Sequence, residues 1–564
     1  MTPAASAKRQ ASPGVPKSSA TSPTLEALLG RGYFPKELPA PFTTESFARA
    51  VSGQATPLPG ALAFAGSTVQ PKGLKTGKPV RYSLAKKGGW QRRLLSLPNP
   101  VHQYLLSHEM VANWGELAKE LGSSPFSATN PTVSSKGRAV RGEHDLGSKP
   151  RLATKARLNK RFILKTDIAQ CYASIYTHAI PWAVMGKQRA KTNRKMSHFA
   201  NRLDCWMRMG QDGETVGIPI GPDTSLIVAE LILQKCDLDL VARFPEVTGY
   251  RYIDDYELGF RERAEAEAAY HVFEGILGDF QLSLNPRKTE VLALPLHVEK
   301  EWVRRLRAFR IRESSAGSQR RDLTDYFDEA LALRESNPAE DVLPYAVGRL
   351  RGLRLSTSNW LGFQQRLLLC AYPEPSCLLH VLTQLIERVN AGLTPDREAI
   401  GALLNALVTE HASLPHSSEV AWALWAAIAL GIAIDSKSVD SLARCDDCAV
   451  ALLALHAQSL GLMSKPLDAT AWLSHMSSAG LYDDHWLLAY EAYVKGWLPS
   501  RDGTDYIGAD PAFDFMRANG VTFYDSTLAL PTTPTSPIPV PQSPSTALAA
   551  GDADSLTDSE DYYV

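Results

Sequence analysis

Two adjacent aspartates in the middle of the chain could hold a cation. Asp254 and Asp255 lie between Tyr250-Arg251-Tyr252-Ile253 and Tyr256-Glu257-Leu258-Gly259-Phe260. The β-favouring residues on both sides predict two short strands, so the aspartates would form the turn of a hairpin. Two carboxylates at one point repel each other unless a cation lies between them. Aspartate is also a common turn residue, so the segment alone fits a plain polar turn at least as well.

A third aspartate, Asp167, ends the run Phe162-Ile163-Leu164-Lys165-Thr166, which predicts a strand. The residues that follow turn helical, so a helix N-cap is the plain alternative for Asp167. In an antiparallel sheet, however, a strand end and a hairpin turn can meet at one edge. Three carboxylates there would make a site for two divalent, oxygen-preferring cations. Two such ions about 3.5–4 Å apart stabilise the attacking and leaving oxygens of a phosphoryl displacement.

Three other stretches could contact phosphate groups. The Gly/Pro loop 217–225 (GIPIGPDTS) allows a substrate to approach the backbone closely, although it also suits an ordinary helix cap. The turn Asn285-Pro286-Arg287-Lys288 brings two cations, and a cationic run precedes the strand at 162–167. These cations would neutralise phosphate charge. The members of the run are Arg151, Lys155, Arg157, Lys160 and Arg161.

The elements that must position these residues predict an α+β layer. Their order is strand, helix, Gly/Pro loop, helix from about 225 to 244, hairpin, helix from about 263 to 280, and a returning strand that ends near 291. This order indicates helices packed on an antiparallel sheet. Further towards the N-terminus, residues 100–117 have helical spacing.

Length and charge point to a large globular protein with a polyanionic partner. A chain of 564 residues with 44% hydrophobic residues predicts three or four domains. Its net charge of zero conceals an asymmetry: residues 1–200 hold 30 Lys and Arg against 9 Asp and Glu, and residues 201–564 hold 30 against 51. The basic half favours nucleic acid as a partner, the alternative being a solvated basic surface paired with the acidic half.

The same composition predicts a cytoplasmic protein without a membrane partner. No apolar run reaches transmembrane length, and the N-terminus lacks the apolar core of a signal peptide. Seven cysteines in so long a chain do not form a disulfide framework, which favours a reducing compartment.

A strongly basic stretch precedes the predicted sheet. Residues 72–93 hold eight Lys and Arg and no acid, with Tyr82 and Trp90 between them. This combination predicts phosphate contacts and base stacking, although a plain basic loop has the same composition.

The last third of the chain has a different character. From about Leu343 to Leu498, apolar helices separated by short loops predict stacked helical hairpins, an α-solenoid of the HEAT type. Cys445-Asp446-Asp447-Cys448 is a lone C-x-x-C. A zinc site would need a second cysteine pair or a histidine pair at ligand spacing, and the sequence offers neither, so zinc is not predicted.

Taken together, residues 151–291 resemble the palm of a reverse transcriptase. Asp167 matches the aspartate of the family's first motif, and Tyr252 to Asp255 match its Tyr-x-Asp-Asp box. The Gly/Pro loop is similar to the second palm motif, and the Asn-Pro-Arg-Lys-Thr turn is similar to the motif that supplies Lys288. The likeness extends, more loosely, over roughly residues 25–310.

The resemblance implies an RNA-directed DNA polymerase that transfers nucleotides from dNTPs with two Mg²⁺ ions, or Mn²⁺. The aromatic residue five positions after the first aspartate, Tyr172, would act as a steric gate that excludes a 2′-hydroxyl. The implied catalytic residues are Asp167, Asp254 and Asp255, with Ile168 beside them at the metal site. The implied nucleotide-binding residues are Tyr172, Pro219, Ile220, Gly221, Lys288, Arg151 and Arg157.

Motifs, composition and resemblance give one division of the chain. It has a disordered N-terminus (1–24), a fingers-like region (25–150), a palm (151–300), thumb-like connector helices (301–342), a helical-repeat domain (343–515) and a disordered acidic tail (516–564). The expected partners are dNTPs and RNA or single-stranded DNA. A non-coding RNA, a second copy of the chain and a partner polymerase subunit stay open.

One position departs from the family pattern, because Ile220 stands where the second motif usually has Gln. Gln can hydrogen-bond the incoming nucleotide or the template, and Ile cannot. With a helical C-terminal half and no RNase H-like region after the palm, the chain resembles bacterial abortive-infection and other defence-associated reverse transcriptases. Some of these extend DNA without a template and prime from a tyrosine of the protein. The helical half offers Tyr482, Tyr490, Tyr493, Tyr506 and Tyr524 as candidates for such priming, and the tail offers Tyr562 and Tyr563.

Two alternatives remain beside a template-independent or RNA-directed polymerase in antiphage defence. One is a templated reverse transcriptase of a retron-like or intron-like element. The other is a non-catalytic palm that binds RNA as a scaffold, which three intact aspartates disfavour because an unused carboxylate cluster only costs stability.

Overall fold

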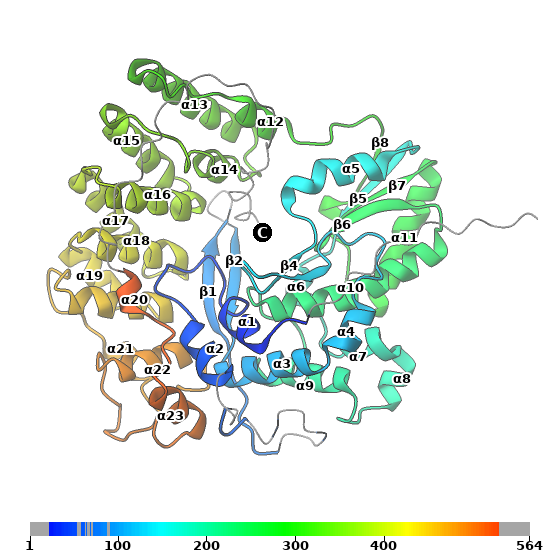
Figure 1. The fold of residues 1–564 in the computed structure, drawn as a ribbon, viewed down its shortest axis with the longest axis horizontal. Coiled ribbons are helices and arrows are strands. Elements are labelled where there is room, and N and C mark those ends of the chain that lie inside the picture. The colour runs from blue at the N-terminus through cyan, green and yellow to red at the C-terminus, as the bar shows by residue number, and fades with distance from the viewer. Residues whose placement is uncertain are drawn as a thin grey trace, which may run out of the picture.

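The structure, a computed structural model, describes residues 22–52, 58–61, 64, 68, 72–86 and 91–529. The disorder expected for residues 1–21 and 530–564, and the stacking expected for Trp90, concern residues outside this description. No helix in the described part of the chain combines the length and apolar character needed to cross a bilayer. Figure 1 shows a small sheet on one side of the molecule and a long array of helices on the other.

The small sheet is antiparallel and confirms the predicted α+β layer. Its strand order is β6-β7-β5-β8. The hairpin strands β6 (Thr248–Tyr252) and β7 (Asp255–Phe260) form as predicted, and β5 (Phe162–Asp167) ends on the expected aspartate. The returning strand is β8 (Glu290–Ala293), which pairs with the other edge of β5.

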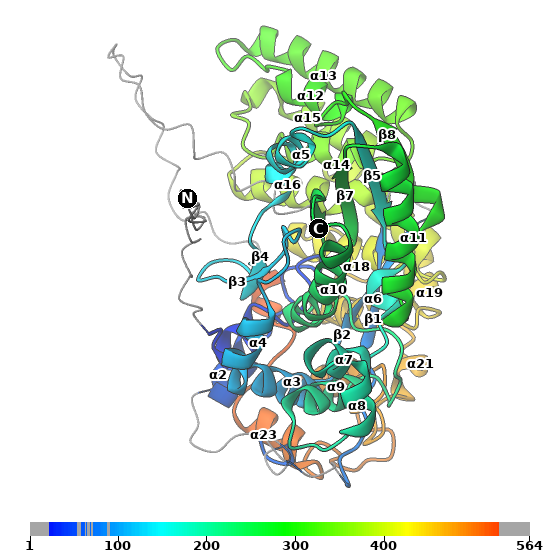
Figure 2. The ribbon, with the colours of Figure 1, turned by 90° about the vertical axis from the view of Figure 1, so that its right-hand side faces the viewer.

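Helices cover both faces of this sheet (Figure 2). Alternate residues of β7 point to opposite faces, and Tyr256, Leu258 and Phe260 are buried towards α11 (Arg263–Asp279). The Tyr256 and Phe273 rings meet there at 4.9 Å. The opposite face carries Asp255, Glu257 and Gly259 and lies against α5 (Lys149–Arg157). The long helix α10 (Asp223–Arg243) packs against α11.

The helices of the N-terminal region, together with those between residues 179 and 209, lie below the sheet in the view of Figure 1. The predicted helix at 100–117 is two helices, α3 (Pro100–Ala112) and α4 (Trp114–Glu120), because the chain leaves helical geometry at Asn113, whose side chain bonds back to Glu109. The others are α1 (Leu25–Gly30), α2 (Glu45–Ser52), α7 (Ala179–Met185), α8 (Lys187–Thr192) and α9 (Phe199–Met209).

Within the basic stretch at 72–93, residues 80–85 and 92–93 belong to a pair of strands. Strands β1 (Val80–Ala85) and β2 (Arg92–Leu97) pair antiparallel. Tyr82 is buried, so the prediction that it stacks on bases is wrong in this structure. Arg92 forms a two-pronged ion pair with Glu419 of α18 (Ser417–Leu430). Here basic and acidic halves of the chain pair with each other, as the alternative reading of the charge asymmetry anticipated.

The C-terminal helices stack in two layers (Figure 1). One layer contains α15, α17 and α19, and the other contains α14, α16, α18, α20 and α22. Two consecutive pairs, α15 with α16 and α17 with α18, pack across the two layers, as the helices of a helical hairpin do. Their bounds are α12 Glu301–Ala308, α13 Ala316–Ser336, α14 Val342–Gly348, α15 Trp360–Ala371, α16 Leu378–Asn390, α17 Arg397–His411, α18 Ser417–Leu430, α19 Ser436–Leu442, α20 Cys448–Ser459, α21 Thr470–Leu473, α22 Trp486–Val494 and α23 Pro511–Ala518.

The predicted start of the disordered tail at residue 516 is too early. Helix α23 continues to Ala518, and Phe523 and Tyr524 beyond it are fully buried. Tyr524 forms a β-bridge with Phe42, so the end of the described chain packs against its beginning. Phe523 and Tyr524 bury enough apolar surface to hold this otherwise polar segment against the core.

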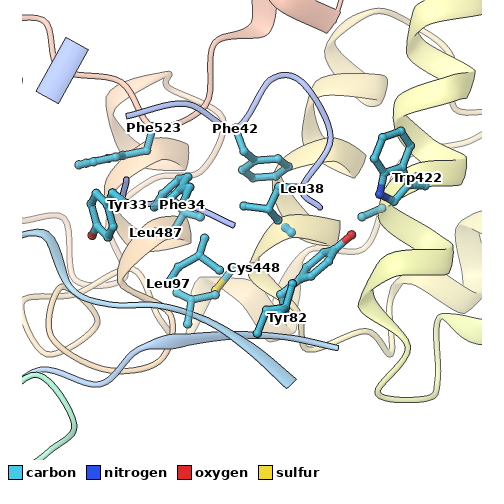
Figure 3. Close-up of a cluster of buried hydrophobic side chains, with 14 of the residues drawn as sticks. Tyr33, Phe34, Leu38, Phe42, Tyr82, Leu97, Trp422, Cys448, Leu487 and Phe523 are labelled. Atoms are coloured by element: carbon cyan, nitrogen blue, oxygen red, sulfur yellow. The ribbon is translucent and has the colours of Figure 1, made fainter. Parts of the chain in front are cut away.

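The N-terminal region and the helical array share a core (Figure 3). Side chains from the first segment, the β1–β2 hairpin and the C-terminal helices meet there, although hundreds of residues separate them in sequence. Phe34 packs against Trp486 and Phe523, with ring centroids 6.5 and 6.0 Å apart. The fingers-like region at 25–150 and the helical array at 343–515 are therefore joined by a continuous apolar interface.

Candidate active site

Three carboxylates meet at one end of the sheet. Asp167 ends β5 and Asp255 begins β7, and the two residues face each other in the register of the pair. Asp254 lies in the turn between β6 and β7, and its carbonyl accepts a hydrogen bond from the Ile168 amide at 3.1 Å. One carboxylate oxygen from each aspartate lies within 4.8 Å of the other two. The expected convergence of a strand end and a hairpin turn is therefore what the structure shows.

Two lysines neutralise part of this negative charge. Lys288 Nζ lies 2.7 Å from Asp167 Oδ2, and the Asn285 side-chain amide donates to Asp167 Oδ1 at 3.0 Å. On the other side, Lys149 Nζ lies 3.8 Å from Asp255 Oδ2 and 4.6 Å from the centre of the Tyr252 ring. The turn at 285–288 thus reaches the carboxylates as expected. Lys149 begins α5 and is not among the site residues that the sequence predicted.

The negative charge that the lysines leave unneutralised disfavours the ionised form of Asp254. Burial, followed by the charges of Asp255 and Asp167, raises the pKa of Asp254 to about 6. Burial alone would lower the pKa of Lys288, but its hydrogen bond and ion pair with Asp167 raise it above its usual value. A cluster of oxygen donors that repel one another is the donor set that hard divalent cations such as Mg²⁺ prefer. The residues present therefore fit a divalent-cation site formed by Asp167, Asp254 and Asp255.

The Gly/Pro loop at residues 217–225 is hydrogen-bonded to Tyr172, five residues after Asp167. The Ile218 amide donates to the Tyr172 carbonyl at 2.8 Å, which fixes the loop against the segment after Asp167. The Ile220 carbonyl accepts from the Ser96 amide of β2 at 2.9 Å. Gly221 has φ +131°, and a Cβ there would lie 2.7 Å from Pro35, so this position requires glycine. Pro219 is buried between these contacts.

Comparison with protein families agrees with this geometry. The model of the family described as "Reverse transcriptase (RNA-dependent DNA polymerase)" matches residues 123–362, a range that contains the three aspartates, Tyr172, the Gly/Pro loop and Lys288. The chain contains a reverse transcriptase domain. No curated protein matches the sequence.

Solved structures of telomerases are similar to part of the chain. Apo telomerase from Candida tropicalis shares 10% identity over 63% of this chain and 70% of its own, with a TM-score of 0.32. Telomerase from Candida albicans in complex with a TWJ fragment of telomeric RNA shares 10% identity over 63% of this chain and 68% of its own, with a TM-score of 0.27.

The two predicted nucleotide-binding arginines, Arg151 and Arg157, differ in burial and in hydrogen-bond partners. Arg151 is exposed on α5. Arg157, at the end of the same helix, is largely buried, and its Nε lies 2.6 Å from Glu257 Oε1. The Arg157 guanidinium also donates to the carbonyls of Leu296 and His297. In this structure Arg157 therefore holds α5 and the chain after β8 on the sheet instead of contacting the three carboxylates.

The sequence did not reveal a buried charge network behind the Tyr-x-Asp-Asp hairpin of the reverse transcriptase domain. Arg251 of β6 is fully buried, and its guanidinium pairs with Glu230 and Asp237 of α10 at 2.8 and 2.9 Å. The same guanidinium donates to the Ile253 carbonyl at 3.0 Å, one residue before Asp254. One signal was present in the sequence: Glu230 and Asp237 are seven residues apart, which places them on the same face of the largely apolar helix α10.

Proposed function

We propose that this protein is a DNA polymerase of the reverse transcriptase type, RNA-directed or template-independent, that serves antiphage defence. The observation that carries the proposal is the meeting of Asp167, Asp254 and Asp255 at the end of an antiparallel sheet, with Lys288 at 2.7 Å from the first of them. The proposed substrates are dNTPs and a nucleic-acid strand with a free 3′ end, or a protein hydroxyl in place of that end.

The proposed roles follow from the position of each side chain. Asp167, Asp254 and Asp255 would hold two Mg²⁺ ions, which supply charge stabilisation for the attacking and leaving oxygens when bound. In the structure Lys288 pairs with Asp167 and Lys149 pairs with Asp255. Once cations neutralise these aspartates, both lysines would be free to contact phosphate oxygens. Exposed Arg151 on α5 is the better placed of the two predicted arginines, since Glu257 engages Arg157.

Tyr172 is proposed to select deoxynucleotides. It lies in the helical turn Cys171–Ser174, five residues after Asp167. Its side chain is half-buried, and its carbonyl accepts a hydrogen bond from the Gly/Pro loop. Replacing Tyr172 by alanine should raise the ratio of ribonucleotide to deoxynucleotide incorporation by about 10–1,000-fold, because the ring that blocks a 2′-hydroxyl is gone. Competition between one rNTP and its dNTP, measured as the ratio of kcat/KM values, tests this.

Tyr172→Phe is the matched control for the gate. It keeps the ring and removes only the hydroxyl, so discrimination should stay within about two- to threefold of wild type. If Tyr172→Phe relaxed discrimination as much as Tyr172→Ala, selection would depend on the hydroxyl group and the steric proposal would be wrong.

Template-independent synthesis and the defence role rest on finer features. Ile220 is half-buried against the core, its carbonyl accepts a hydrogen bond from Ser96, and its side chain cannot hydrogen-bond a nucleotide.

For protein priming, Tyr490 and Tyr506 are poor candidates, because both are buried and donate to backbone carbonyls at 2.9 and 2.7 Å. Tyr524 is buried against His456 as well. Tyr482 and Tyr493 are less buried, and Tyr562 and Tyr563 lie outside the described residues.

Nucleotide incorporation by the purified full-length chain tests the proposed function. With Mg²⁺ and all four dNTPs, we expect labelled DNA whose synthesis stops when Mg²⁺ is chelated. Incorporation that persists after nuclease removal of co-purifying RNA would support template-independent synthesis, and label that stays on the protein after denaturation would support protein priming. Dependence on added RNA would indicate a templated enzyme of the retron-like kind. No incorporation by wild type under any of these conditions would favour the non-catalytic scaffold.

A further inference from the structure

A second cluster of possible metal ligands lies in the helical array, at the C-x-x-C motif. The two cysteines are not part of it: Cys445 and Cys448 are buried, and the Cys448 thiol points to the Asp484 carbonyl at 3.4 Å. One of the two residues between them, Asp446, is instead exposed and faces His475 and His485. Asp446 follows α19, His475 follows α21 and His485 precedes α22. The histidine pair that the sequence did not offer at ligand spacing is thus supplied by the fold.

The three side chains converge on one point. His475 Nε2 and His485 Nε2 lie 3.4 and 2.8 Å from the same atom, Asp446 Oδ1. The imidazole rings are stacked, with centroids 3.5 Å apart and planes 8° apart. One ligand atom from each residue lies within 4.8 Å of the other two. Two imidazoles and a carboxylate are a ligand set that suits zinc and related transition metals, and Mg²⁺ or Ca²⁺ would prefer oxygen atoms alone.

An independent observation supports a cation at this point. The other ring nitrogen of His485, Nδ1, lies 3.0 Å from Asp484 Oδ1. Metal-binding histidines commonly donate that second N–H to a carboxylate, which directs the lone pair of the first nitrogen to the ion. With the hydrogen on Nδ1, His485 Nε2 would present a lone pair to Asp446 Oδ1 at 2.8 Å. Either a second proton on His485 or a cation removes the repulsion between these two lone pairs, and a bound cation would take the place of that proton.

We propose that Asp446, His475 and His485 bind a divalent transition-metal ion, Zn²⁺ in the first place, with Asp484 orienting His485. Parallel rings cannot direct two in-plane lone pairs to one ion, so the ring of His475 must rotate about χ2 when the ion binds. This torsion is broad, and the His475 side chain is 21% exposed, which leaves it room to turn. The proposal does not depend on the polymerase activity.

The position of this site suggests what the ion would hold together. Asp447, next to Asp446, accepts from the Ser417 hydroxyl, and that hydroxyl accepts from the Ser83 amide of β1 at 2.8 Å. Trp486, next to His485, donates to the Leu97 carbonyl of β2 at 3.1 Å. An ion at this site would therefore link the segment before α20 to the segment before α22, next to the two residues, Ser417 and Trp486, that hydrogen-bond the β1–β2 hairpin. The same hairpin holds the Ile220 loop through Ser96.

Zn²⁺ binding by the full-length chain tests the proposal. In excess Mg²⁺, which occupies the cluster of three aspartates, titration calorimetry should show about one Zn²⁺ per chain, and Zn²⁺ should raise the melting temperature. Asp446→Asn and His485→Gln should each abolish this binding and the stabilisation. Asp484→Asn should weaken binding by about 10–100-fold. Asp446 is 70% exposed, so its variant is expected to fold even if His485→Gln does not.

His411→Gln is the matched control, because His411 and His416 form another histidine pair, with Nδ1 atoms 2.8 Å apart. The acid beside that pair, Glu419, is engaged by Arg92, so His411→Gln should leave Zn²⁺ binding unchanged. Substitution by Co²⁺ reports the ligands: nitrogen and oxygen ligation is expected, without a thiolate charge-transfer band. Binding that survives Asp446→Asn, disappears in His411→Gln, or shows the thiolate band would overturn the proposal, as would no Zn²⁺ binding by wild type.

Discussion

Asp254→Asn is expected to abolish nucleotide incorporation and, without divalent cations, to make the protein more stable. Incorporation should fall at least about 1,000-fold, the size that follows from losing several kcal/mol of transition-state stabilisation. Stability should rise because Asp254 is half-buried between two other carboxylates, Asp167 and Asp255. Asparagine has a similar shape and no charge, so the repulsion disappears while the turn keeps its geometry.

The pH dependence of this effect has a definite sign. The pKa of Asp254 is raised to about 6, so between about pH 4 and pH 6 the folded state binds more protons than the unfolded state. Wild-type stability therefore falls through this range because of Asp254, and the full cost is present above about pH 6. A pKa of about 6 in place of the ordinary aspartate value corresponds to about 3 kcal/mol, and partial exposure of the side chain reduces this to about 2 kcal/mol.

Chemical denaturation at pH 5 and pH 7.5, with EDTA or Mg²⁺, measures these effects. In EDTA, the advantage of Asp254→Asn over wild type should be larger at pH 7.5 than at pH 5. Mg²⁺ should stabilise wild type and have much less effect on the variant, because the variant lacks one of the three carboxylates. Asp328→Asn, an exposed aspartate on α13, is the control and should change neither stability nor activity. A wild type that gains nothing from Mg²⁺ would contradict the proposed cation site.

The sheet and its carboxylates were predictable because local patterns specify them. Asp167 ends a short β-rich run, and Asp254 and Asp255 interrupt alternating β-favouring residues, so strand ends and turn follow from neighbouring residues alone. An antiparallel sheet then leaves few ways to pair these strands. The register that places Asp167 opposite Asp255 is one of them, and the structure has it.

The contacts that sequence reasoning missed are all long-range. Tyr82 stands in a run of cations typical of a nucleic-acid surface, yet it is buried because helices more than 300 residues away cover the β1–β2 hairpin. His475 and His485 are separated by nine residues and meet Asp446 because α20 packs on α22 and Trp472 of α21 donates to the Cys445 carbonyl beside Asp446. Phe523, in a polar segment, packs on Phe34 from the start of the chain. No local pattern encodes these partners.

The buried network behind the catalytic hairpin is expected to be the most stability-critical charge in the reverse transcriptase domain. Arg251→Met should lower the free energy of unfolding by about 3–5 kcal/mol, because it leaves Glu230 and Asp237 buried without their cation. Activity should fall as well, since Arg251 also donates to the Ile253 carbonyl beside Asp254. Urea denaturation and dNTP incorporation by the same preparation measure the two effects.

Two further variants separate the loss of charge pairing from a simple change of shape. Arg263→Met makes the same substitution in the exposed pair with Glu267 and should cost no more than about 0.5 kcal/mol. Adding Glu230→Gln and Asp237→Asn to Arg251→Met should recover at least about 1 kcal/mol, because the stranded charges are removed. The hydroxyls of Thr129 and Tyr256 can still donate to the amide oxygens, and the Ser124 hydroxyl can turn to accept from the amide N–H that replaces the second carboxylate oxygen of Asp237. If Arg251→Met cost no more than Arg263→Met, the turn that carries Asp254 would owe its position to the β6–β7 pairing alone, and the buried arginine would have no part in positioning the carboxylates.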